Sequence, residues 1–312
     1  MRESSAFHIR TIIFLTSIIV LTLGISNCSK TNDQGDPNYI KEVEEWHNNR
    51  ITSLTKPDGW LSLTGLHWLK EGKNSFGGSE QNDIRFAGKN LPDKMGDFIV
   101  EDSVIYVEVE PGVQITHEDV PIKKMKLKDD TTGEPTQLRY QSLLWYIIKR
   151  GERYAIRLKD SQSESLLNFS GIETFPVQSK WRVTAHFTAY DPPKTIEVPN
   201  VLGTIIENPS PGKLSFTLDN REYSLDPIAD PEDKRWFIIF GDNTNGEETY
   251  GAGRYLYIDA PGEDGTTIID FNKAYNPPCV FTPYATCSLP PDQNFLELRL
   301  TAGEKYYHGY DH

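Results

Sequence analysis

One segment, residues 270–291, combines two cysteines with prolines, aromatic residues and amides. Cys279 and Cys287 can form a disulfide that clamps the loop, which the chain-entropy model values at about 2.5 kcal/mol. Alternatively, one of them supplies a thiolate nucleophile or a metal ligand. The prolines fix backbone torsions and lower the entropy of the loop before anything binds to it. The segment therefore predicts either a built site or a structural clamp.

A second group of polar side chains surrounds this segment. Asp270 and Asn272 are two positions apart at the end of a predicted strand, so both can point to one face. Arg254 follows a glycine-rich turn, and an arginine near carboxylates and amides can bind a carboxylate or phosphate through two hydrogen bonds. The alternative is a buried arginine–aspartate pair, with Asn and Asp side chains satisfying the loop backbone. The candidate ligand-binding residues are Glu248, Arg254, Asp270, Asn272, Tyr275, Asn276 and Tyr284.

Catalytic and cofactor motifs with a defined spacing are absent from the sequence. It holds no Gly-x-Ser-x-Gly elbow, no P-loop and no glycine-rich dinucleotide-binding motif followed by a helix. Apart from His308 and His312 at the C-terminal end, the seven histidines show no zinc-site spacing. We expect no metal and no cofactor. If the protein is an enzyme, the catalytic candidates are Asp270 or Cys279 acting with Arg254, in a hydrolase or transferase reaction.

The N-terminus has the layout of a targeting segment. Arg2 and Arg10 form a positive region, and the apolar run after them is shorter than the ~20 residues of a membrane-spanning helix. The run ends at Cys28 in a sequence that resembles a bacterial lipobox, in which a signal peptidase cuts before a cysteine that receives a lipid. Asn27 departs from the small residue usual before that cysteine. Residues 1–27 are therefore predicted to be a lipoprotein signal peptide, with ordinary secretion as the alternative.

The mature chain is expected to begin with a short anchor region. Residues 28–37 are polar and contain glycine, which predicts a flexible tether behind the lipidated Cys28. Ser29, rather than an aspartate, follows the cysteine, and this favours the outer membrane. We therefore expect a lipid-anchored protein of the bacterial cell envelope, held at the outer membrane by its lipid.

The charge balance restricts the partners. The formal net charge is −13 at pH 7, with 45 acidic and 32 basic side chains. Such a chain is repelled by a phosphate backbone, and it has no basic run or arginine-rich helix, so we expect no nucleic-acid partner. The expected partners are the membrane, through the lipid anchor, and either a small ligand or another envelope protein.

Only one helix is evident from the pattern of apolar residues. Asp36 and Pro37 are typical of the cap and the first position of a helix. Apolar residues then recur at helical spacing, which predicts an amphipathic helix over residues 38–56. Trp46 and His47 are assigned to the packing of this helix against the rest of the protein.

The remainder of the chain has the pattern of a β protein. Short alternating runs are broken by Gly, Pro, Asn and Asp, which is typical of sandwiches and barrels. In residues 181–189, apolar and polar side chains alternate, which predicts a half-buried antiparallel strand. A polar stretch at 160–165 marks a boundary. We expect a first β domain at 57–160 and a larger antiparallel β sandwich or barrel domain at 170–312.

Three motifs carry a resemblance to a known family. They are Asp-Pro-Pro-Lys-Thr-Ile-Glu-Val-Pro-Asn at 191–200, Glu-Thr-Tyr-Gly-Ala-Gly-Arg at 248–254, and the segment at 270–291. With them the chain resembles the bacterial family catalogued as domain of unknown function 1684 (DUF1684), over about residues 39–305. That family has no settled activity, so the resemblance implies no catalytic roles for these residues.

A second resemblance covers the first β region. Residues 69–84 are similar to the opening of forkhead-associated domains, in which a glycine-containing turn precedes Asn-Asp-Ile. The resemblance implies a forkhead-associated-like β-sandwich at 57–160. Gly78 stands where those domains carry the arginine that binds phosphothreonine, and their Ser-Arg-x-His and Asn-Gly turns are not recognisable. We therefore expect no phosphopeptide binding.

The leading functional hypothesis is that the loops at 248–291 bind a small ligand or a partner. We expect residues 270–291 to fold back over the second β domain and close one wall of a pocket, with Arg254 facing Asp270 or Asn276. A pocket lined by these three residues favours binding or catalysis. The alternatives are the enzyme described above and a purely structural envelope lipoprotein.

Overall fold

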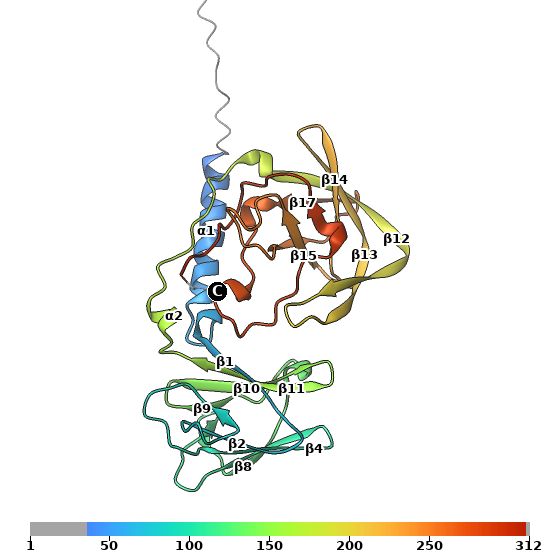
Figure 1. Cartoon of the computed structure of the whole chain (residues 1–312). Coiled ribbons are helices and arrows are strands. Elements are labelled where there is room, and N and C mark those ends of the chain that lie inside the picture. Colours follow the sequence, from blue (N-terminus) through green and yellow to red (C-terminus); the bar gives the residue numbers. More distant parts are fainter. Residues whose placement is uncertain (1–35, 310–312) are drawn as a thin grey trace, which may run out of the picture. The chain divides into compact units, whose positions relative to one another are not determined.

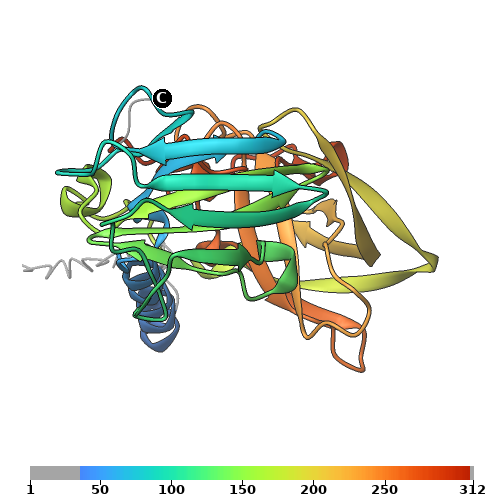
Figure 2. The same ribbon diagram turned by 90° about the horizontal axis from the view of Figure 1, so that it is seen from below.

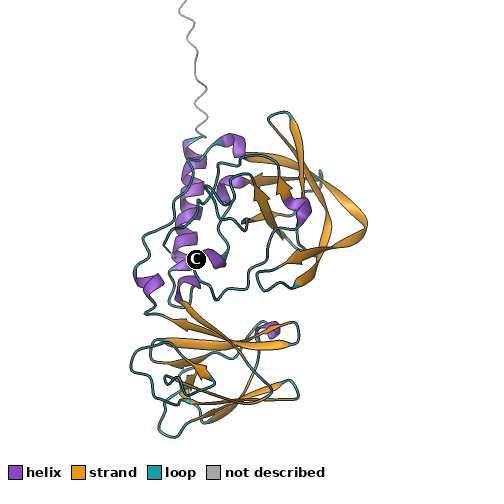
Figure 3. Cartoon of the chain, viewed as in Figure 1, coloured by secondary structure: helices purple, strands orange, loops and turns teal. Residues whose placement is uncertain are grey.

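The computed structural model describes residues 36–309, which belong to one compact unit at 33–312. Strands dominate this unit, and a long helix lies at its start (Figures 1 and 3). The predicted mainly β fold with an N-terminal helix is therefore confirmed. Cys28, the predicted signal peptide at 1–27 and most of the predicted tether at 28–37 lie outside the described residues.

Helix α1 (Pro37–Leu54) is capped as its sequence predicts. The Asp36 carboxylate accepts the backbone N–H of Asn38 at 3.0 Å, and Pro37 occupies the first turn. One face of the helix buries Val43 and Leu54, and Leu54 joins a hydrophobic cluster of the C-terminal loops. In the part of the chain that the structure describes, no helix is both long and apolar enough to cross a bilayer.

Two sheets build the first β part, which Figure 2 shows from below. Six strands have the order β1-β11-β10-β9-β6-β7, and five have the order β3-β2-β4-β5-β8. Side chains from both sheets fill one core, in which Phe76, Phe98 and Trp145 are fully buried. This is the β-sandwich that the sequence predicts. The strands are β1 (Leu63–Trp68), β2 (Gly72–Gly77), β3 (Ile84–Arg85), β4 (Gly96–Glu101), β5 (Val104–Val109), β6 (Thr116–His117), β7 (Val120–Pro121), β8 (Lys124–Leu127), β9 (Leu138–Tyr140), β10 (Leu143–Arg150) and β11 (Arg153–Asp160).

Two further sheets build the C-terminal β part, with the orders β14-β13-β12-β17 and β16-β15-β18. In β12, Val183 and Ala185 are buried whereas Arg182 and Thr184 are exposed. This confirms the alternation predicted for residues 181–189, and apolar side chains from both sheets share one core. The strands are β12 (Arg182–Pro199), β13 (Ile205–Leu218), β14 (Arg221–Leu225), β15 (Arg235–Asp242), β16 (Arg254–Asp259), β17 (Thr266–Asp270) and β18 (Phe295–Leu296).

Short helical turns connect the strands, although the sequence predicts no helix after the first. In α2 the Ser163 hydroxyl caps a single turn by accepting the N–H of Leu166 at 3.2 Å. Strand β18 ends at Leu296, where the N–H of Leu298 bonds back to the Leu296 carbonyl oxygen at 2.7 Å. The turns are η1 (Trp60–Ser62), η2 (Asp130–Thr132), α2 (Glu164–Leu167), η3 (Ser179–Trp181), η4 (Phe271–Lys273), η5 (Pro278–Val280) and η6 (Asp292–Asn294).

The C-terminal loops also contact strand β1. Leu63 packs in one small cluster with Cys279, Ala285 and Cys287. The Thr282 hydroxyl donates to the Leu63 carbonyl oxygen at 3.0 Å. Residues 279–287 are thereby fixed to the first β part. The exact domain limits at 57–160 and 170–312 stay a prediction.

Candidate functional site

Cys279 and Cys287 form a disulfide, with Cα atoms 6.1 Å apart. Both residues are buried, and the backbone N–H of Cys279 points to the sulfur of Cys287 at 3.0 Å. Of the alternatives that the sequence leaves open, the structure contains the loop clamp. A bonded sulfur is no thiolate, so in this state Cys279 offers neither a nucleophile nor a metal ligand.

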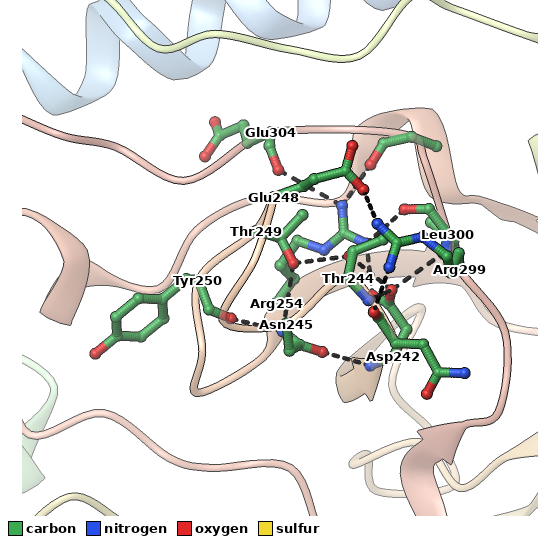
Figure 4. A network of polar contacts seen from close by, with 12 residues as sticks. Asp242, Thr244, Asn245, Glu248, Thr249, Tyr250, Arg254, Arg299, Leu300 and Glu304 are labelled. Carbon is green, nitrogen blue, oxygen red and sulfur yellow. Dashed lines mark hydrogen bonds and ion pairs between the residues drawn. The ribbon is translucent and has the colours of Figure 1, made fainter.

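Arg254 does not face Asp270 or Asn276, and that prediction is wrong. It opens β16, and its side chain enters the fully buried space between β15 and the C-terminal segment (Figure 4). There its Nη2 contacts Asp242 Oδ2 at 2.7 Å and donates to the Leu300 carbonyl oxygen at 3.0 Å. The sequence gives no local hint of this pairing, because Asp242 lies at the end of the preceding strand.

Several backbone groups complete the Arg254–Asp242 cluster. Arg254 Nη1 donates to the carbonyl oxygen of Ala302, while Asp242 Oδ1 accepts the N–H of Thr244 at 2.8 Å. Burial lowers the pKa of Arg254 from its usual value, whereas the Asp242 carboxylate acts in the opposite direction. The guanidinium stays charged, since arginine does not lose its proton in proteins. The cluster therefore joins the C-terminal segment to the second core. Glu248 lies at its exposed edge, where it pairs with Arg299 (Figure 4).

Asp270, Asn272 and Asn276 hold helix α1 in place. The Tyr39 hydroxyl donates to Asp270 Oδ1 at 2.7 Å and accepts Asn272 Nδ2 at 2.8 Å. Burial, followed by the hydrogen bond to Asp270, raises the pKa of Tyr39 well above its usual value, so the phenol remains a donor. Near the other end of the helix, Arg50 Nη2 donates to the Asn276 carbonyl oxygen at 2.8 Å. The sequence predicts that these three residues bind a ligand, but in the structure they position helix α1.

Glu304 is the buried acid at the centre of this contact. Its Oε2 accepts the Asn276 N–H at 2.7 Å, and its Oε1 accepts Arg50 Nε at 3.3 Å. His47 Nδ1 lies 3.9 Å from Oε1, too far for a hydrogen bond. The Glu304 side chain is fully buried, and that of Arg50 is only 14% exposed. The pair fixes the register of α1 on the loop, a role that the sequence analysis missed.

An open groove of about 580 Å³ lies along α1, and we call it the aromatic groove. The helix contributes side chains at positions i, i+3, i+4 and i+7, which form one stripe of its surface. Strands β15 and β16, the loop after η4, and the first residues of η1 and η5 form the rest. The lining residues are Trp46, Asn49, Arg50, Ser53, Trp60, Arg235, Phe237, Tyr255, Tyr257, Tyr275 and Pro278.

Two guanidinium groups lie over aromatic rings in the groove. The Cζ of Arg50 is 4.5 Å from the centroid of the Tyr275 ring, and that of Arg235 is 5.0 Å from the Tyr257 ring. These distances are typical of cation–π contacts. The Tyr257 and Tyr275 rings are 6.4 Å apart, and the Trp46 ring is 6.2 Å from Tyr275. The groove thus joins a row of rings to two positive charges.

The charge of the groove contrasts with that of the chain. Acidic side chains outnumber basic ones by 45 to 32 in the whole sequence, yet the lining holds two arginines and neither Asp nor Glu. Burial raises the pKa of Tyr255 and of Tyr275, so both phenols are neutral near pH 7. The groove therefore suits a ligand that combines a negative charge with a flat apolar face.

The structure divides the predicted site residues into three groups. Tyr275 lines the aromatic groove, whereas Arg254, Asp270, Asn272 and Asn276 are buried and do not line it. Glu248 and Tyr284 are not among the groove's lining residues, and Tyr284 is 37% exposed. Sequence reasoning missed the contribution of α1, although Trp46, Asn49, Arg50 and Ser53 recur at helical spacing. Within residues 36–309, no cluster of three or more His, Cys, Asp or Glu side chains is placed to hold a metal ion.

The fold and the groove define a mainly β protein whose N-terminal helix forms one wall of a surface groove. Residues 167–305 match the family described as protein of unknown function (DUF1684). The solution NMR structure of an uncharacterized protein of Haloarcula marismortui is 31% identical, covers 44% of this chain and 77% of that one, and has a TM-score of 0.38. The Rv0020c FHA structure is 14% identical, covers 30% of this chain and 89% of its own, and has a TM-score of 0.21. No curated protein matches the chain.

Proposed function

We propose that this protein is a lipid-anchored protein of the bacterial cell envelope, at the outer membrane, that binds a small anionic ligand in the aromatic groove. The observation that carries the binding proposal is the lining itself. It has two arginines, six aromatic residues and no carboxylate, in a chain of net charge −13. The two arginines attract anionic ligands, and the faces of the aromatic rings supply apolar contact area.

The anchor proposal has separate support. The positive region with Arg2 and Arg10, the apolar run and Cys28 follow one another in the order of a lipoprotein signal. Helix α1 begins at Pro37, only a short stretch after Cys28. An anchored protein of this design holds its groove close to the envelope surface, where small anionic molecules from outside can reach it.

Binding is favoured over the two alternative functions. A hydrolase or transferase that uses Cys279 needs a free thiolate, and this sulfur is bonded to Cys287. Arg254 is fully buried and paired with Asp242, so it cannot reach a substrate beside Asp270. Arg235 makes no ion pair among the described residues. A purely structural lipoprotein does not require such a guanidinium in the groove, whereas anion binding does.

Tryptophan fluorescence provides a direct test, because Trp46 and Trp60 line the groove. The mature protein is titrated with a panel of uronic acids, aromatic carboxylates, nucleoside monophosphates and inorganic phosphate. We expect at least one of these anions to change the emission in a saturable way. Replacing Arg235 with alanine should weaken that binding about tenfold, as the loss of one charge-assisted contact predicts.

Arg221→Ala is the matched control for Arg235→Ala. Arg221 is also an exposed arginine over a tyrosine, with its Cζ 6.0 Å from the Tyr223 ring, but it lies on β14 outside the groove. Its replacement should leave the affinity unchanged. If no anion of the panel binds, or if both variants weaken binding equally, the groove is not an anion site. The result then favours the alternative of a purely structural envelope lipoprotein.

A further inference from the structure

We infer that the ligand of the aromatic groove is an acidic saccharide, bound with a sugar face on the tyrosine rings and its carboxylate at Arg235. This inference rests on the proposed function and narrows the class of ligand. The groove offers three kinds of contact at once: ring faces, hydrogen-bonding groups and positive charge. An acidic sugar carries all three complements, since its ring has an apolar C–H face, a hydroxyl rim and a carboxylate.

The openness of the groove favours a ligand that remains partly hydrated. Tyr257 is 47% exposed, Arg235 is exposed, and Asn49 and Ser53 lie on the exposed side of α1. Sites for compact apolar ligands usually enclose most of the ligand surface. A saccharide can place one face on the rings while its hydroxyls remain in water, so an exposed row of rings is enough to hold it.

The helix supplies hydrogen-bonding groups that have no other task. The side chains of Asn49 and Ser53 are four positions apart on one face of α1. Neither makes a side-chain hydrogen bond within residues 36–309. An amide and a hydroxyl each offer both a donor and an acceptor, which is what sugar hydroxyls require. An aromatic acid has no use for these groups beyond its carboxylate.

The two arginines differ in how they are held. Arg50 is fixed by Glu304 and by the Asn276 carbonyl oxygen, which use its Nε and its Nη2. Its charge is thereby compensated, and its guanidinium forms a rigid part of the wall over Tyr275. Arg235 makes no ion pair within 4 Å in the described part of the chain, although Asp259 lies opposite it on β16, so its exposed guanidinium is the one that can turn to a ligand carboxylate.

The rings adjoining Arg235 indicate where the sugar face lies. Tyr257 is directly beneath its guanidinium, and the Tyr257 and Tyr275 planes are only 15° from parallel. A carboxylate bound by Arg235 therefore brings the attached ring over one or both tyrosines. Replacing either Arg235 or Tyr257 should weaken binding of the same ligand, because Arg235 binds its carboxylate and Tyr257 contacts its sugar ring.

The test uses isothermal titration calorimetry on the mature protein with oligomers of galacturonic, glucuronic and mannuronic acid. Methyl esters of the same oligomers serve as uncharged counterparts, with benzoate and adenosine monophosphate as non-saccharide anions. We expect an acidic oligomer to bind, and its methyl ester to bind about tenfold more weakly. Tyr257→Ala and Arg235→Ala should each weaken the acidic oligomer about tenfold, while Arg221→Ala should not.

The outcomes separate this inference from the proposed function. If benzoate or the nucleotide binds in the groove and no acidic oligomer does, the saccharide assignment is overturned while anion binding stands. If the esters bind as tightly as the acids, or if neither variant changes the affinity, the assignment is also overturned. If none of these compounds binds, the proposal of an anion-binding groove fails together with it.

Discussion

The guanidinium of Arg254 is enclosed by one carboxylate and by carbonyl oxygens of the C-terminal segment. Isolated burial of a charge is costly, but a charge that is paired and hydrogen-bonded can remain inside a protein, and here only Nε of the guanidinium lacks a hydrogen-bond partner among the described residues. Here the pair also determines where residues 300–304 lie, because they supply the accepting carbonyl groups. The Arg254 guanidinium, which from the sequence could bind a ligand, therefore stabilises the fold instead.

The replacement Arg254→Ala tests this assignment. It leaves the Asp242 carboxylate buried without its partner, and removing one member of a buried pair typically costs about 3–5 kcal/mol. We expect a loss of that size in the free energy of unfolding, measured by urea denaturation. Arg299→Ala is the control, since this exposed arginine pairs with Glu248 at the surface and should cost less than about 1 kcal/mol. Equal stability of the two variants contradicts the structural role.

Tyr255 makes the stability of the protein depend on alkaline pH. Burial raises the pKa of its phenol in the folded state, whereas the unfolded chain has the ordinary value of about 10. A group with a raised folded-state pKa contributes stability that is fully present below the unfolded pKa and is lost as pH rises above it. We therefore expect the free energy of unfolding to fall above about pH 10.

Tyr255→Phe isolates this contribution. The variant loses a hydrogen bond to the Ser288 carbonyl oxygen, 2.8 Å long in the structure, so at neutral pH it should be less stable by about 1 kcal/mol. Above pH 10 its stability should fall less steeply than that of the wild type, by up to about 1.4 kcal/mol per pH unit. Urea denaturation at several alkaline pH values measures both slopes. Parallel slopes contradict the prediction.

At the scale of elements, α1 is held at both ends by residues of the C-terminal loops. Tyr39 bonds to Asp270 near its start, and Arg50 bonds to Glu304 near its end. Because most of the stability of a helix in a protein comes from tertiary packing, these contacts and the buried side chains Val43 and Leu54 keep it folded. The groove depends on the same contacts, since α1 forms one of its walls.

Glu304→Ala should loosen this helix. The change leaves the Nε of Arg50 and the N–H of Asn276 without an acceptor and removes the carboxylate that balances the Arg50 charge, at a cost of about 3 kcal/mol. Hydrogen exchange should become faster for the amides of α1, and groove ligands should bind more weakly. Glu173→Ala is the control, since Glu173 is 82% exposed and lies 3.5 Å from Lys305. Unchanged exchange in α1 means that Glu304 does not hold the helix.

The disulfide belongs to the same scale, because it closes a short loop. The loop-entropy model predicts that removing it costs about 2.5 kcal/mol. We expect this loss for the double replacement of Cys279 and Cys287 by alanine, with groove binding retained, since neither residue lines the groove. A thiol reagent should find both cysteines blocked in the unreduced wild type. A rapidly reacting thiol at Cys279 revives the enzyme alternative.

At the scale of the whole molecule, local patterns predicted more than distant contacts. Strand β12 could be predicted because alternation of period two is a property of neighbouring residues, and α1 because its cap and its apolar spacing are local. The disulfide was one of several options that the cysteine spacing allows. The aromatic groove was not predicted, since Trp46, Arg235 and Tyr275 come together only in the folded chain. The same holds for the partner of Arg254.

At the scale of the whole molecule, the proposed lipid anchor on Cys28 would determine where the protein is located. A chain of net charge −13 gains nothing from anionic lipid surfaces, so electrostatic attraction does not hold it at a membrane. One acyl chain binds membranes only marginally, whereas two chains anchor a protein stably. A diacylglycerol on Cys28 supplies two, and its loss should release the protein.

Cys28→Ala should therefore move the protein from the membrane fraction to the soluble fraction after cell lysis and centrifugation. The wild-type N-terminal peptide should begin at residue 28 and carry the mass of the acyl chains. Ser29→Ala is the matched control, because it keeps the cysteine and should remain with the membranes. Ser29→Asp should stay lipidated but shift from outer-membrane to inner-membrane fractions in a density gradient. If the Cys28 variant still sediments with membranes, something other than this lipid holds the protein there, and the anchor proposal is wrong.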